Sequence, residues 1–131
     1  MITRINTFSG EFKEMGFDHV ALSLIPNKSS IVMPEYGTYN KLIERIQQHP
    51  ALEIPTVDIL NDYHRLGAGA YLKSDSHWTC EGRTIWINNT VALLKQLVRP
   101  SDIANTDVSA VNFRCLPPVS TRNLISSAQL Q

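Results

Sequence analysis

The sequence predicts an α/β fold in which a short parallel sheet is flanked by helices. Two nearly continuous apolar runs, Val20–Ile25 and Pro55–Leu60, are typical of strands buried on both faces of a sheet. The segment between them repeats apolar residues at helical spacing: Tyr39, Leu42, Ile43 and Ile46. A strand, a helix and a second strand in this order form a right-handed crossover, which places the two strands in parallel.

Two further helices are predicted to flank this unit. The first spans residues 2–15 and has Gly16 as a C-terminal cap; its apolar positions are Ile2, Ile5, Phe8, Phe12 and Met15. The second runs from Cys80 to about Val98 with Thr79 as its N-cap. Its buried stripe is expected to be Trp86, Thr90, Leu93, Leu94 and Leu97. Residues 27–34 are predicted to form a loop.

The chain length predicts one domain over residues 1–131, in a partial or reduced form because two strands are few for an open sheet. Residues 101–131 form a weakly determined C-terminal tail, in which Val108–Phe113 is a possible short strand. Sheet edges left open by so few strands would allow a homo-oligomer to form.

Composition excludes several classes of partner. Twelve acidic and twelve basic side chains balance, so neither a nucleic-acid footprint nor an electrostatic membrane contact is expected. No cofactor is implied, and the spacings of the four histidines match no metal-binding motif. Cys80 and Cys115 are expected to be reduced thiols. Without a signal peptide the chain as given is expected in the cytoplasm, or in the periplasm if it was cut from a longer exported protein.

The segment Tyr71–Gly82 carries the clearest chemical signal. Asp75 and His77 are two residues apart, and in extended backbone such residues point to the same face. A carboxylate beside an imidazole can orient the ring and stabilise its charged form, which is half of a Ser-His-Asp triad. The alternative is a turn in which Asp75 caps backbone amides while His77 stays on the surface.

A family resemblance rests on the order of these motifs. The first strand leads into Pro26-Asn27-Lys28-Ser29-Ser30-Ile31, and the β-α-β unit is followed by Asp75-Ser76-His77-Trp78-Thr79 with Gly82 opening a helix. Over roughly residues 20–94 this resembles the SGNH-hydrolase-like domain of alginate O-acetyltransferases and related polysaccharide acetylation proteins. The resemblance implies a reduced three-layer α/β/α fold of the SGNH or flavodoxin-like type. It also implies that His77 is the general base, that Asp75 is its orienting acid and that Trp78 packs behind the histidine.

The nucleophile of that family is missing from its usual place. In the family it lies after the histidine motif in a Gly-Asp-Ser-like turn, whereas Gly82 is the last glycine of this chain. The serines beyond Gly82 lie in no tight glycine turn: Ser101, Ser109, Ser120, Ser126 and Ser127. Cys80 beside His77 is an alternative nucleophile, although an inert thiol is the simpler expectation.

Three polar residues and one aromatic residue are candidate substrate-binding groups. Lys28, Ser29 and Ser30 follow the first strand, at the edge of the sheet where α/β proteins bind ligands, and Ser29 or Ser30 could be recruited as a nucleophile. Satisfying local backbone amides is the simpler expectation for these residues. Trp78 could form a pocket wall that stacks on sugar, or it could belong to the core.

Two functions follow from these residues. The first is a partial SGNH-like domain related to polysaccharide O-acetyltransferases and esterases, inactive on its own for lack of a nucleophile, whose substrate would be a glycan or an acyl ester. The second is a complete, small, non-catalytic protein that binds or interacts as an oligomer.

Overall fold

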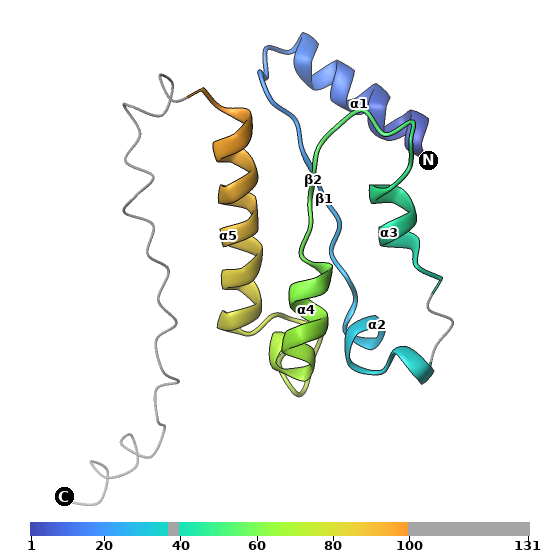
Figure 1. Ribbon diagram of the computed structural model, residues 1–131, viewed down its shortest axis with the longest axis vertical. Coiled ribbons are helices and arrows are strands. Elements are labelled where there is room, and N and C mark those ends of the chain that lie inside the picture. Colours follow the sequence, from blue (N-terminus) through green and yellow to red (C-terminus); the bar gives the residue numbers. More distant parts are fainter. Residues whose placement is uncertain (37–39, 100–131) are drawn as a thin grey trace, which may run out of the picture.

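The computed structural model describes residues 1–36 and 40–99 of the chain (Figure 1). The elements in order are α1 (Ile2–Glu14), β1 (Leu22–Ser23), α2 (Lys28–Val32), the 3-10 helix η1 (Pro34–Tyr36), α3 (Leu42–Gln47), β2 (Thr56–Val57), α4 (Leu60–Leu66), the 3-10 helix η2 (Gly67–Ala70) and α5 (Cys80–Leu97). The predictions for Tyr39, Cys115 and residues 101–131, including the strand at 108–113, lie outside the described residues.

The two strands pair in parallel, as predicted. Leu22 lies opposite Thr56 and Ser23 lies opposite Val57. The long helix α5 packs against β2, and Figure 1 shows α5 on one side of the strand pair and α3 on the other. The described chain is therefore a mixed α/β structure with a small two-stranded parallel sheet.

Both strands are much shorter than the apolar runs predicted. Pro55, which has no N–H group, precedes β2, although its carbonyl still accepts the Leu22 amide. After β2, the Asp58 carboxylate accepts the Leu60 amide and turns the chain into α4. The pairing is confined between these two points, and Ile25, predicted to be buried, is 51 % exposed.

One helix occupies a predicted loop, and another begins at the last residue of a predicted strand. The predicted loop at 27–34 contains α2, because the Asn27 side chain accepts the Ser30 amide and caps a short helix. The predicted strand Pro55–Leu60 ends early, and α4 follows it. Both helices present apolar side chains to the core, where Ile31 and Tyr63 are buried.

The hydrophobic core lies where α2, α4 and η2 meet the strand pair. Its buried members are Ile31, Val57, Ile59, Leu60, Tyr63, Ala70 and Tyr71. From α5, Ile85, Trp86 and Leu93 pack against this cluster, so the predicted stripe is confirmed at Trp86 and Leu93, whereas Leu94 is exposed and Ile85 was not predicted. Trp86 also donates from Nε1 to the Ser23 hydroxyl at 2.8 Å and so joins α5 to β1.

The N-terminal helix forms as predicted, but much of its apolar face is uncovered. Gly16 has a φ of +97°, and the Phe17 and Gly16 amides bond back to the carbonyls of Phe12 and Lys13, which is a Schellman cap. The Asn6 side chain holds α1 to the segment before β2 through Ala51 and Glu53. The side chains of the apolar face that are exposed are Phe8, Phe12 and Met15.

Gly82 provides a sharp test of how α5 packs. An added Cβ at this position would clash with the carbonyl oxygen of Ala70 and lie 3.2 Å from its carbonyl carbon. We expect Gly82→Ala to destabilise the fold by about 1–3 kcal/mol because rigid backbone must move. Gly10→Ala, where a Cβ meets nothing within 4 Å, should instead stabilise α1 by about 0.5–1 kcal/mol.

Urea unfolding followed by tryptophan fluorescence measures both changes. Equal stability of the two variants would contradict the close approach between α5 and η2.

Candidate functional site

The motif that contains Asp75 and His77 forms a closed loop between η2 and α5. Tyr71 and Trp78 face each other in an antiparallel bridge, and the Leu72 amide donates to the His77 carbonyl at 2.9 Å. At the base of the loop, the Thr79 amide donates to the Ala70 carbonyl at 2.9 Å. The loop returns the chain to its starting point and places residues 73–77 outside the core.

Asp75 and His77 are in direct contact within this loop. Oδ1 of Asp75 accepts the His77 backbone amide at 2.6 Å and lies 3.1 Å from Nδ1 of the His77 ring. Both expectations for this pair hold at once, since the carboxylate caps an amide and also orients the imidazole. With Nδ1 donating to Asp75, Nε2 is left as the proton acceptor of the neutral ring.

The electrostatics of Asp75 follow from these contacts. The His77 amide is the main reason that the pKa of the Asp75 carboxyl is lowered, and the His77 ring and Lys28 lower it further. Both side chains stay solvated, since His77 is 84 % and Asp75 is 46 % exposed. Asp75 is therefore ionised at neutral pH.

Lys28 anchors this loop from α2. Its ammonium donates to three backbone carbonyls, those of Leu72 at 2.6 Å, Lys73 at 3.0 Å and Asp75 at 3.0 Å. An ammonium group has three N–H donors, so all three are engaged. Lys28 thus fixes the backbone that carries the Asp75 carboxylate, and its predicted role in binding substrate stays a prediction.

An aromatic cluster supports the loop from the core side. Trp78 lies 5.7 Å from Tyr63 and 6.1 Å from Trp86 between ring centroids. The Tyr71 hydroxyl donates to the Pro26 carbonyl at 2.7 Å, and burial raises its pKa to about 12. The Tyr63 hydroxyl donates to the Gly82 carbonyl, and burial also raises its pKa. Trp78 accordingly packs against the core, which is the simpler of its two expected roles, and a role behind the histidine stays a prediction.

His77 and Trp78 also line a pocket of about 420 Å³ together with Ile25, Ser76 and Arg83. The pocket brings the segment after β1, the loop and the first turn of α5 together beside the imidazole. Arg83 was not singled out from the sequence. The signal that could have revealed it was the Thr79 cap, because a helix that begins at Cys80 places position 83 in its first turn beside His77.

The two predicted serines lie in a different pocket. Ser29 and Ser30 line a cavity of about 590 Å³ between α2, η1 and the start of α3. Ser29 donates to Oδ1 of Asn27 at 2.8 Å, so its hydroxyl supports the side chain that caps α2. Ile25 lines both pockets and is the residue that they share.

In the part of the chain that the structure describes, no hydroxyl or thiol is hydrogen-bonded to the His77 ring, although Ser76 lines the same pocket. The ring's hydrogen bond is made to Asp75, and no described hydroxyl or thiol bonds to Nε2. Cys80 is in a disulfide bond, so the expectation that it is a reduced thiol is wrong. The alternative in which Cys80 acts as the nucleophile is also wrong, because it requires a free thiol. The serines considered beyond Gly82 lie outside the described residues.

Neither a metal site nor a membrane-spanning helix is present in residues 1–36 and 40–99. No group of three or more His, Cys, Asp or Glu side chains there could hold a metal ion. His49 serves locally, since its Nδ1 accepts the Ala51 amide. None of the helices in this part of the chain is long and apolar enough to cross a membrane.

Comparison of the chain with protein-family models, with curated proteins and with solved structures found no match. The resemblance to the SGNH-like domain therefore stays a prediction that rests on the motifs of this sequence.

The anchoring role of Lys28 can be tested through the carboxylate that it positions. In Lys28→Met we expect the pKa of Asp75 to rise toward its ordinary value of 3.8, because a positive charge is removed and the capping geometry loosens. A carbon-detected NMR titration of the carboxyl group measures this value. Lys73→Met, which removes another lysine of the loop, is the matched control.

The sign of the accompanying stability change follows from the direction of the shift. Folding lowers the Asp75 pKa, so the contribution of the carboxylate is present above the ordinary value and is lost as the pH falls through the lowered one. An Asp75 titration that is the same in native protein and Lys28→Met would contradict the anchoring role.

Proposed function

We propose that this chain carries the general base and the orienting acid of an O-acyl-transfer site, within a partial SGNH-like domain related to polysaccharide O-acetyltransferases and esterases. The observation that carries the proposal is the 3.1 Å contact between His77 Nδ1 and Asp75 Oδ1 beside a pocket. Helices on both sides of the parallel strand pair are consistent with a reduced three-layer α/β/α, SGNH- or flavodoxin-like arrangement.

The chemistry assigned to His77 is proton transfer. Nε2 takes a proton from an attacking hydroxyl group or water, whose oxygen adds to the ester carbonyl. Asp75 stabilises the imidazolium that forms, and Arg83, which lines the same pocket, supplies positive charge for the developing oxyanion. As the intermediate collapses, the ester C–O bond breaks and the imidazolium returns the proton to the leaving alcohol.

The natural substrate would be a glycan or another acyl ester. If the attacking group is a serine, an acyl-enzyme forms, and a sugar hydroxyl or water then accepts the acyl group. Because no described hydroxyl is hydrogen-bonded to Nε2 of His77, the described part of the chain is expected to be inactive toward a natural ester. No cofactor, nucleic acid or membrane takes part in the proposed reaction.

The compartment follows from the same proposal. A polysaccharide-modifying protein of this kind would work in the periplasm, and the cytoplasm is the alternative compartment. The disulfide at Cys80 supports the first alternative, because disulfide bonds persist in oxidising compartments.

A non-catalytic oligomeric binding protein is the second candidate function. Two observations favour it. Neither strand of the described sheet pairs with a third strand, and the apolar side chains of Phe8, Phe12 and Met15 on α1 are exposed. Such surfaces are suited to contacts between subunits.

Hydrolysis of p-nitrophenyl acetate separates the two functions. Its activated ester can be hydrolysed by a water molecule that His77 deprotonates, so the test does not require the missing serine. We expect native protein to release p-nitrophenol at least about tenfold faster than His77→Ala, with Asp75→Asn also impaired. His19→Ala, which removes an exposed histidine outside the site, should behave like native protein.

Equal rates for native protein and His77→Ala would overturn the acyl-transfer proposal for this chain. The binding function would then be favoured.

A further inference from the structure

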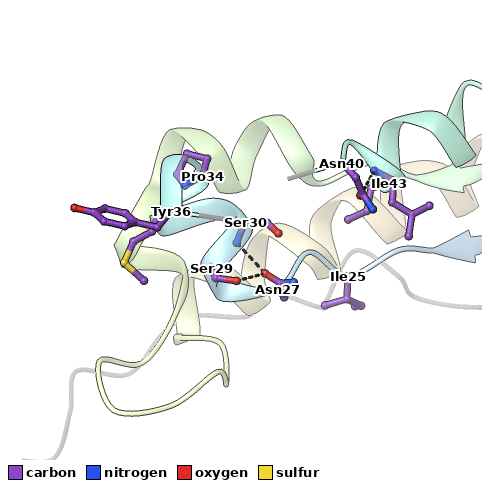
Figure 2. Close-up of a pocket in the computed structure, with 10 residues that line it drawn as sticks. Ile25, Asn27, Ser29, Ser30, Pro34, Tyr36, Asn40 and Ile43 are labelled. Atoms are coloured by element: carbon purple, nitrogen blue, oxygen red, sulfur yellow. Dashed lines mark hydrogen bonds between the residues drawn. The ribbon is translucent and has the colours of Figure 1, made fainter. Parts of the chain in front are cut away.

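The pocket that contains Ser29 and Ser30 has no charged side chain among its described lining residues (Figure 2). It encloses about 590 Å³ between α2, η1 and the start of α3, within the roughly 300–1,000 Å³ typical of small-molecule sites. Its polar groups are carboxamides and hydroxyls, and none of its lining residues is Asp, Glu, Lys, Arg or His. A ligand that complements this surface has hydrogen-bonding groups but no charge at the points of contact.

Two asparagines present fixed amide donors to this pocket. Oδ1 of Asn27 is held by the Ser29 hydroxyl and the Ser30 amide, both at 2.8 Å, and Oδ1 of Asn40 accepts the Leu42 amide at 3.1 Å. In each case the oxygen is engaged, whereas the NH₂ group makes no hydrogen bond to a described residue. These two NH₂ groups are pre-positioned donors for hydroxyl oxygens of a ligand.

Apolar groups and one aromatic ring complete the surface. Ile25 and Ile43 contribute aliphatic walls, and the Tyr36 side chain is 82 % exposed. In Figure 2, Tyr36 and Asn40 lie on opposite sides of Asn27, so the polar and aromatic groups are spread along the pocket. Sugar rings combine hydroxyl edges with apolar C–H faces, and an exposed aromatic ring offers such a face a stacking surface.

We infer that this pocket binds an uncharged hexose segment of a glycan chain. Ile25 lines both this pocket and the one that contains His77, so a glycan held here could continue past Ile25 to the imidazole. The inference rests on the proposed acyl-transfer function only for the delivery of an ester to His77. Binding of the sugar itself requires no catalysis.

Binding is tested by titrating the isotope-labelled chain with four neutral tetrasaccharides in NMR: cellotetraose, mannotetraose, maltotetraose and chitotetraose. We expect at least one to shift the side-chain NH₂ signals of Asn27 and Asn40. Those of Asn6 and Asn89, which already donate within the protein, should stay in place. Tetragalacturonate, a charged chain of the same length, should bind at least about fivefold more weakly than the best neutral sugar, because nothing in the lining offsets its carboxylates.

Two variants assign binding to the pocket. Asn27→Asp keeps the acceptor that caps α2 but replaces the NH₂ donor, so it should weaken the best neutral sugar at least about fivefold without unfolding the helix. Tyr36→Ala should weaken binding similarly, whereas Met15→Ala on α1 should bind like native protein.

No shift with any of the four neutral sugars would overturn the inference, as would equal or tighter binding of tetragalacturonate. Neutral-sugar binding that survives both Asn27→Asp and Tyr36→Ala would also overturn it. Because the readout is binding, failure of the ester assay leaves this result intact, and the reverse also holds.

Discussion

The structure of the candidate site depends on the ammonium group of Lys28. This single cation joins α2 to the loop after η2. It donates to three backbone carbonyls of that loop, those of Leu72, Lys73 and Asp75. Hydrogen bonds from charged donors are stronger than neutral ones, and three of them on one loop leave its backbone few alternative paths. The contact between Asp75 and His77 is built on a backbone that Lys28 holds in place.

The contact between Asp75 and His77 was easier to predict from the sequence than the role of Lys28, which holds their loop in place. The spacing of Asp75 and His77 indicated that the two side chains share a face, and they do form a contact. The role of Lys28 could not be derived in the same way, because it depends on a contact across 44 to 47 residues. The local pattern showed a cation at the sheet edge, which is as compatible with binding a ligand as with binding carbonyls. The separation of Ser29 and Ser30 into a second pocket had no sequence signal for the same reason.

The fold shows a similar division between local and non-local information. Gly16 and Thr79 act as helix caps where the sequence placed them, because capping depends on neighbouring residues. The lengths of β1 and β2 depend on how far two distant segments run together, and the apolar runs were mistaken for strands throughout. The short helix α2 was missed because the polar run after Pro26 resembles a loop, although Asn27 caps it. The disulfide bond of Cys80 was not predicted, because two cysteines in a chain do not form the spacing pattern of a disulfide framework.

Hydrogen exchange in native protein and Lys28→Met tests the central claim most directly. The Leu72 and His77 amides bond to the His77 carbonyl and the Asp75 carboxylate inside the loop, whereas the Tyr63 amide of α4 bonds to the carbonyl of Ile59, the residue before that helix. If Lys28 holds the loop, exchange at Leu72 and His77 should accelerate at least about tenfold in the variant, with Tyr63 nearly unchanged. Unchanged exchange at Leu72 and His77, or an equal acceleration at Tyr63, would contradict the account.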